Sequence, residues 1–125
     1  MTTWTSEELN KIGKAEELQI ASVRHDGTLR NRVIIWVVRV GDNLYVRSVN
    51  GRTSAWFRGV RTRYEGLIQA SGVVKDVSFI EESDPAINEQ IDAACRTKYR
   101  RYAESIINHI NGSEARAATI KLVPL

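Results

Sequence analysis

The sequence predicts a β-barrel of the α+β class, with six mostly antiparallel strands, a short N-terminal helix and a long or broken helical segment before the last strand. Short runs of alternating apolar and polar residues recur along most of the chain, separated by turns rich in Gly, Asn and Asp. One long apolar stripe at helical spacing comes near the end. The 125 residues are enough for one domain, expected at residues 1–125, and too few for two.

The first half of the chain predicts a helix followed by an antiparallel meander. Ser6 is expected to cap the helix and Gly13 to end it. Turns at Asp26-Gly27 and Gly41-Asp42-Asn43 separate three strands. These strands are expected at Glu17–Arg24, Leu29–Val40 and Asn43–Val49. The second is apolar on both faces from Val33 to Val38, which predicts a central position in the sheet.

The second half predicts a short helix, two strands, a longer helical region and a closing strand. The three strands are expected at Tyr64–Ala70, Val73–Glu81 and Ala117–Val123. Ser83-Asp84-Pro85 has the capping residue and first-turn proline of a helix start, and Asn111-Gly112 marks the end. The apolar stripe between them predicts one bent helix or two helices joined near Arg101. Its members are Ile87, Ile91, Cys95, Tyr99, Tyr102, Ile106 and Ile110.

The composition is that of an ordinary globular protein, with 42% apolar and 26% charged residues. No apolar run is long enough to cross a bilayer, and the first residues lack the pattern of a secretion signal, so a cytoplasmic protein without a membrane segment is expected. Cys95 is the only cysteine, which excludes an internal disulfide and fits a reducing compartment. The two histidines, His25 and His109, are unclustered, so no metal site is expected.

The stretch from Leu44 to Gly59 is the strongest candidate for a binding site. It begins as an alternating strand, turns at Asn50-Gly51 and continues as a short helix that carries Trp56. The first backbone N–H groups of a helix have no intrahelical partner and attract anions. Arginines within the stretch can grip an anion with several donors. Such a corner suits a phosphate attached to a flat ring system.

Arginines are expected to converge on this corner. From Arg24 to Arg63 there are nine arginines against two aspartates, a local balance of +7 in a chain of net charge +3. If the second and third strands pair across their turn, Arg39 lies opposite Tyr45. By that register Arg30 and Arg32 project beyond the third strand, towards Asn50 and Arg52. Guanidinium groups gathered without a counter-ion would repel one another. A bound anion or an acidic partner surface is therefore expected there.

The order of these motifs resembles the flavin-binding split-barrel group, particularly its small deazaflavin-dependent nitroreductase branch. The matching residues are Gly27, Arg30, Val33 to Val38, Ser48, Asn50, Gly51, Trp56 and Phe57. Over nearly the whole chain the sequence also resembles a family of short bacterial proteins of unknown function. The signatures of that family are Arg47 to Arg52, Ser54 to Val60, Lys75 to Val77, Lys98-Tyr99 and Leu122 to Pro124.

The split-barrel resemblance implies a homodimer that binds FMN or a deazaflavin where two barrels meet. It implies that the phosphate and ribityl chain contact Arg30, Arg32, Arg47, Ser48, Asn50, Gly51, Arg52 and Ser54, with Trp56 against the ring. The sequence departs from the nitroreductase branch in two ways. Val33 or Ile34 stands where that branch has proline, and the longer insertion before the Trp helix is absent.

The leading functional hypothesis is a flavin- or deazaflavin-binding oxidoreductase, in which the cofactor supplies the redox chemistry. No catalytic residue is assigned, because the chain has no Gly-rich nucleotide motif, no Ser-His-Asp arrangement and no convincing carboxylate pair. One alternative is a non-catalytic barrel whose arginine patch binds nucleic acid or an acidic protein. Nucleic acid is the weaker of these, because the arginines cluster at one turn. Another is a structural dimer whose cavity is filled by side chains. Separately, Trp36 and Trp56 are each more often core residues than stacking platforms.

Overall fold

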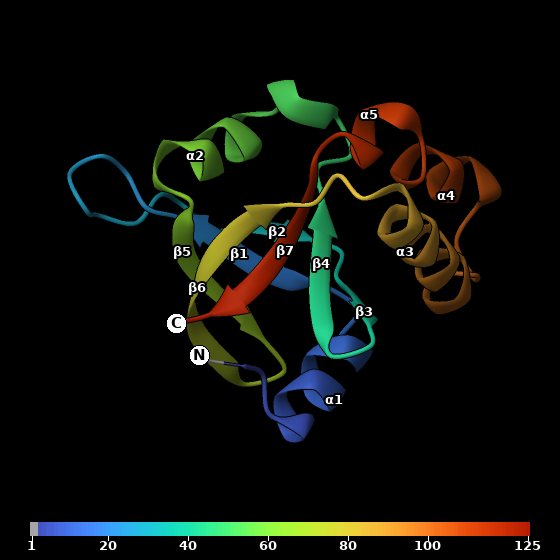
Figure 1. Ribbon diagram of the computed structural model, residues 1–125, viewed down its shortest axis with the longest axis horizontal. Coiled ribbons are helices and arrows are strands. Elements are labelled where there is room, and N and C mark those ends of the chain that lie inside the picture. Colours follow the sequence, from blue (N-terminus) through green and yellow to red (C-terminus); the bar gives the residue numbers. More distant parts are fainter. Residues whose placement is uncertain (1–2) are drawn as a thin grey trace.

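The computed structural model describes residues 3–125 and consists of one curled antiparallel sheet of seven strands, with helices beside it (Figure 1). The strands are β1 (Leu18–Ser22), β2 (Val33–Ile35), β3 (Val38–Val40), β4 (Asn43–Arg47), β5 (Glu65–Ala70), β6 (Val73–Glu81) and β7 (Thr119–Pro124). The helices are α1 (Ser6–Lys14), α2 (Ala55–Arg63), α3 (Pro85–Lys98), α4 (Glu104–Ile110) and α5 (Ser113–Arg116), with a single 3-10 turn at Gly51–Thr53. The strand order β2-β1-β5-β6-β7-β4-β3 forms a half-barrel.

The curled sheet and its helices agree with the predicted barrel-like architecture, but there are seven strands instead of six. The predicted strand Leu29–Val40 is split into β2 and β3, because the chain leaves the sheet at Trp36 and Val37. β2 pairs with β1, whereas β3 pairs with β4. The predicted central position is wrong, since β2 and β3 form the two opposite edges of the sheet.

The break between β2 and β3 is held by side chains from the end of α3. The backbone N–H of Val37 donates to the Tyr99 hydroxyl at 3.2 Å, and the carbonyl of Val37 accepts from Lys98 Nζ at 2.5 Å. The same hydroxyl lies 2.8 Å from the carbonyl of Glu16. Trp36 stacks on the Tyr99 ring, with ring centroids 3.8 Å apart and an interplanar angle of 5°. These contacts replace the missing strand partner of Val37 and fix the Trp36 ring.

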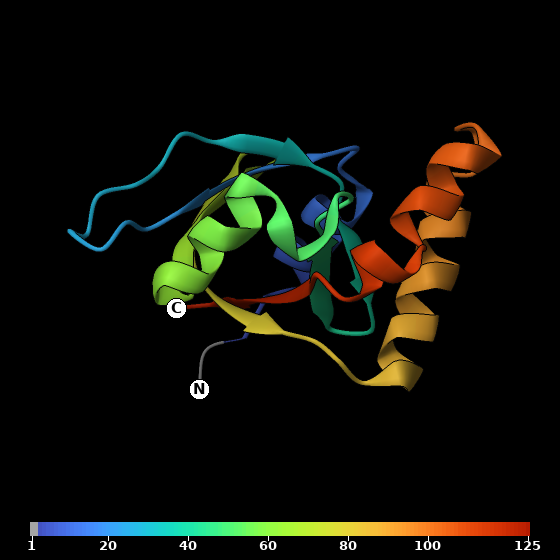
Figure 2. The same ribbon diagram turned by 90° about the horizontal axis from the view of Figure 1, so that it is seen from above.

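The helical elements follow the sequence pattern closely. Thr5 caps α1 in place of Ser6, because its hydroxyl and the Glu8 carboxylate form a reciprocal capping box, and α1 continues through Gly13. The long helical region is broken after α3, near Arg101 as expected. In Figure 2, α3 and α4 lie together at one end of the molecule, and the loop between β1 and β2 extends from the other.

Two apolar clusters form the core. The larger fills the inside of the curled sheet and includes Trp4, whose indole N–H donates to the carbonyl of Leu122 at 3.0 Å. The smaller lies between β3, β4 and the helices α3 and α4. Cys95 belongs to this second cluster, and burial raises the pKa of its thiol to about 11. Within residues 3–125, no helix is both long and apolar enough to cross a membrane.

Candidate functional site

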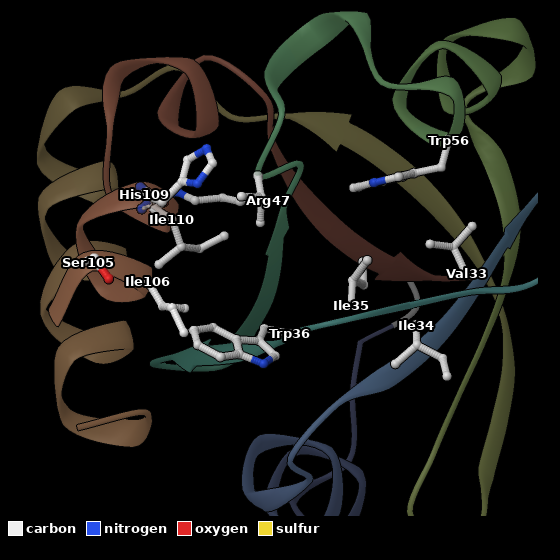
Figure 3. Close-up of a pocket in the computed structure, with 11 residues that line it drawn as sticks. Val33, Ile34, Ile35, Trp36, Arg47, Trp56, Ser105, Ile106, His109 and Ile110 are labelled. Carbon is white, nitrogen blue, oxygen red and sulfur yellow. Dashed lines mark hydrogen bonds between the residues drawn. The ribbon is translucent and has the colours of Figure 1, made fainter. Parts of the chain in front are cut away.

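A cavity of about 580 Å³ lies beside the edge strand β2. Figure 3 shows Val33, Ile35 and Trp56 on one side of it and residues of α4 on the other. Trp36 lies at the end of β2, and the α4 residues are Ser105, Ile106, His109 and Ile110. Its walls are mostly apolar and aromatic, and its volume is in the range of small-molecule sites.

A second, smaller cavity of about 250 Å³ adjoins the first. It is lined by Ile20, Ser22, Arg24, Arg30, Asn31, Val33, Ala55, Trp56 and Val60. Val33 and Trp56 line both cavities, so the two cavities are neighbours, and together they are called the groove along β2. The larger cavity is mostly apolar and the smaller contains two guanidinium groups, and Trp56 stands where they meet.

Arg30 is the most informative side chain of the smaller cavity. Its Nε atom is buried and has no hydrogen-bond partner, and its Nη2 makes one long contact of 3.4 Å to Thr62 Oγ1. The side chain lies against Gly59 of α2, where an added Cβ would be 2.9 Å from Arg30 Nε and 2.8 Å from Ser22 Oγ. Gly59 thus makes room for this guanidinium, which retains unused donor capacity beside the groove.

Arg47 lines the larger cavity, but its donors are engaged within the chain. The side chain is 2% exposed, and its Nη1 donates to Asp92 Oδ1 at 2.6 Å. Nη2 donates to the carbonyl and side-chain oxygens of Asn88, and Nε donates to Thr119 Oγ1. The predicted phosphate contact at Arg47 is therefore corrected to a buried ion pair, because no donor remains free for a ligand.

Two other predicted cofactor contacts also point elsewhere. Arg52 pairs with Glu81 at 2.6 Å and donates to the carbonyl of Ala117. Arg32 is exposed and donates to the side chains of Gln19 and Gln69. The arginines do not converge as expected. Arg30 and Arg32 come just before β2, and β2 pairs with β1, whereas only β3 pairs with β4. The two arginines therefore do not extend past the end of β4.

The pairing of β3 with β4 also differs by one residue from the predicted register. Val38 lies opposite Tyr45, where Arg39 had been expected. The turn between these strands contains only Gly41 and Asp42, because Asn43 already pairs with Val40. The shorter turn accounts for the shift.

In the turn from Ser48 to Ser54, which precedes α2, the polar side chains form hydrogen bonds with one another and with the backbone. The Ser48 hydroxyl lies 2.7 Å from the carbonyl of Gly51 and 2.6 Å from the Ser54 hydroxyl. Gly51 has φ of +81°, which favours glycine, and Asn50 is exposed. Ser48 is fully buried, so this corner sets the direction in which the chain enters α2 and positions Trp56.

Residues 8–122 match the family model DUF2255, described as an uncharacterized protein conserved in bacteria. The chain belongs to the DUF2255 family. This agrees with the resemblance to short bacterial proteins of unknown function. A search of curated proteins finds none that matches the DUF2255 chain.

Solved structures of similar fold are numerous. A conserved hypothetical protein of Mycobacterium tuberculosis has a TM-score of 0.72 at 9% identity, covering 98% of the DUF2255 chain and 82% of its own. An F420-H2 dependent reductase has a TM-score of 0.61 at 15% identity, covering 86% and 93%. A FAD-binding protein of Mesorhizobium loti has a TM-score of 0.59 at 18% identity, covering 98% and 91%. At these identities the likeness concerns the fold, which is that of split-barrel proteins.

Several lining residues of the DUF2255 groove were not among the sequence candidates. Trp36 had been considered as a core residue, and Ser105 and His109 had no assigned role. Exposed polar residues on a helix give no periodic signal, so only their position opposite β2 identifies them. The described residues 3–125 contain no group of three or more His, Cys, Asp or Glu side chains placed to bind a metal.

Proposed function

We propose that this DUF2255 protein is a homodimeric oxidoreductase that binds a flavin or deazaflavin in the groove along β2. The observation that carries the proposal is that the two cavities meet at Trp56. Arg30, whose buried Nε has no hydrogen-bond partner among the described residues, lines one cavity, and mostly aromatic and aliphatic side chains line the other. A phosphate joined to a flat ring system matches both parts at once.

The residues of the groove divide the binding task between them. Arg30, with Ser22 and Asn31 nearby, would hold the phosphate of the cofactor. Trp56 and Val33 would contact the middle of the molecule, and Trp36 and Ile35 the ring system. The bound cofactor would supply hydride or electron transfer, and the protein would orient it and exclude water. Two similar structures named for F420-H2 and FAD support this class of ligand.

The exposed apolar residues around the groove support a homodimer. Ile34 of β2 is 58% exposed, Ile106 of α4 is 46% exposed and Val49 is 39% exposed, and all three line the larger cavity. β2 is an edge strand with apolar side chains on both faces, and exposed apolar side chains of this kind mark a contact surface. A second copy packed on β2 would bury Ile34 and close the groove. One similar structure is described as a domain-swapped dimer.

The charge distribution favours this function over a nucleic-acid or acidic-protein site. Arg47, Arg52, Arg61 and Arg63 each lie within 4 Å of a carboxylate of the same chain. Pairing of these four guanidinium groups lowers the unbalanced charge that an anionic polymer would meet.

Titration with FMN, FAD and F420, followed by absorbance and fluorescence, tests the cofactor proposal. We expect at least one of the three to bind, and Arg30→Gln to weaken that binding by about 10- to 100-fold, because a hydrogen-bonded charge is lost. Arg58→Gln is the matched control, since Arg58 is the neighbour of Gly59 on α2, against which Arg30 packs, and lines neither cavity. Absence of binding by all three cofactors, or equal losses in the two variants, would contradict the proposal.

Sedimentation velocity tests the proposed dimer. We expect the wild-type protein to sediment as a dimer and Ile34→Asp as a monomer, because the new carboxylate would be desolvated in the interface. Val74→Asp is the control, since Val74 is 51% exposed on β6 and lines neither cavity of the groove. A monomeric wild-type protein, or a dimer that survives in Ile34→Asp, would disprove this assembly.

A further inference from the structure

Two polar side chains of α4 face the larger cavity without hydrogen-bond partners. Ser105 and His109 are four residues apart and therefore lie on one face of the helix. Figure 3 places them across the cavity from β2 and Trp56. Both residues are exposed, and in the described part of the chain neither side chain forms a hydrogen bond to another protein group, so a ligand can replace water at their donors.

Among the described residues, the rest of the lining offers two indole N–H groups, of Trp36 and Trp56, and the guanidinium of Arg47. Asp92, Asn88 and Thr119 use the donors of Arg47. Within residues 3–125 no carboxylate lines the cavity, so a cationic ligand would find no counter-charge from this part of the chain. The nearest acid to Arg47, Asp92, is shared between Arg47 and Arg116.

We infer that α4 forms the substrate wall of the groove, and that Ser105 and His109 bind the carboxylate of a flat, apolar substrate. This rests on the proposed function, which assigns the opposite wall at β2 and Trp56 to the cofactor. Imidazole has an N–H donor in both protonation states, and the serine hydroxyl provides a second donor. Hydrogen bonds to a carboxylate are stronger than those to a neutral acceptor, so this pair selects the anion.

Calorimetric titration with 2-naphthoate and its neutral analogue 2-naphthylmethanol tests the assignment. Each titration uses the full-length protein with and without saturating FMN. We expect His109→Ala to weaken 2-naphthoate binding by about tenfold and 2-naphthylmethanol binding by less than about twofold. His109→Gln, which retains an N–H donor, should restore part of the loss. His25→Ala is the control, because His25 lies in the loop between β1 and β2 and outside the cavity.

The outcomes separate this inference from the proposed function. Loss of 2-naphthoate affinity in His109→Ala, with FMN binding and the unfolding midpoint unchanged, supports the substrate wall. Equal losses of 2-naphthoate affinity in His109→Ala and His25→Ala would overturn it. Equal affinity of the wild-type protein for 2-naphthoate and 2-naphthylmethanol would also overturn it, as would no measurable binding of 2-naphthoate. If the protein binds 2-naphthoate selectively but binds none of FMN, FAD and F420, the carboxylate site at Ser105 and His109 is supported and the cofactor proposal is disproved.

Discussion

Replacing Arg47 by methionine should lower the free energy of unfolding by about 3–5 kcal/mol, since one partner of a buried ion pair is removed. Arg47 lies in β4, and its side chain reaches Asp92 of α3, Thr119 of β7 and Asn88 of α3. The substitution leaves Asp92 with only Arg116, whose Nε lies 3.4 Å away, and leaves Asn88 without its strongest donor. Equilibrium urea unfolding followed by circular dichroism measures the loss.

A second arginine of the predicted phosphate set provides the control for Arg47. Arg52 pairs with Glu81 at the same distance of 2.6 Å, but its side chain is partly exposed to water. Arg52→Met should therefore cost at most about 1 kcal/mol. The double variant Arg47→Met/Asp92→Leu should recover part of the stability lost in Arg47→Met, because the unpaired carboxylate is gone. Equal losses in Arg47→Met and Arg52→Met would refute this interpretation.

Replacing Tyr99 by phenylalanine should cost about 1–3 kcal/mol of unfolding free energy, because it leaves a buried backbone donor unsatisfied. The Tyr99 hydroxyl accepts from the N–H of Val37, at the point where the chain is in neither β2 nor β3. Burial raises the pKa of this phenol, so it stays protonated and can donate to a carbonyl as well. The phenylalanine ring can still stack on Trp36, which isolates the effect of the hydroxyl.

Tyr64→Phe is the matched control for Tyr99. The Tyr64 hydroxyl also makes a hydrogen bond, at 2.8 Å to Glu81, but on the surface. We expect its loss to change stability by less than about 0.5 kcal/mol. Hydrogen exchange at the Val37 amide should be faster in Tyr99→Phe than in the wild-type protein. If Tyr99→Phe were as stable as Tyr64→Phe, the hydroxyl would not be what holds the break between the strands.

The sequence predicted the general architecture because periodicity reports which residues are apolar at regular spacing. It located most strands within a few residues and the break in the helical region near Arg101. It misplaced the run from Val33 to Val38, because an apolar pattern on two faces does not identify what covers them. The structure divides this run between opposite edges of the sheet. The outer side of β2 borders the groove, and the Tyr99 hydroxyl accepts the hydrogen bond of Val37 between the two strands.

The candidate site was predicted only in part, because partners distant in sequence decide which cations are free. An arginine in the middle of a strand must reach water, a carboxylate or a ligand. For Arg47 the carboxylate of Asp92 meets this need, and no local pattern indicates a partner 45 positions away. Arg30 and Trp56 retain positions in the groove, while Arg32 and Arg52 pair elsewhere.

The shortness of the two edge strands has a consequence for self-association. β2 and β3 each contain three residues, so neither offers a long row of unpaired backbone groups on which further copies could add strands. In the proposed dimer, contact between copies would depend on side chains such as Ile34, and a patch that packs against itself is satisfied by a single twofold partner. Such an assembly would stop at a closed pair and would not grow into fibres.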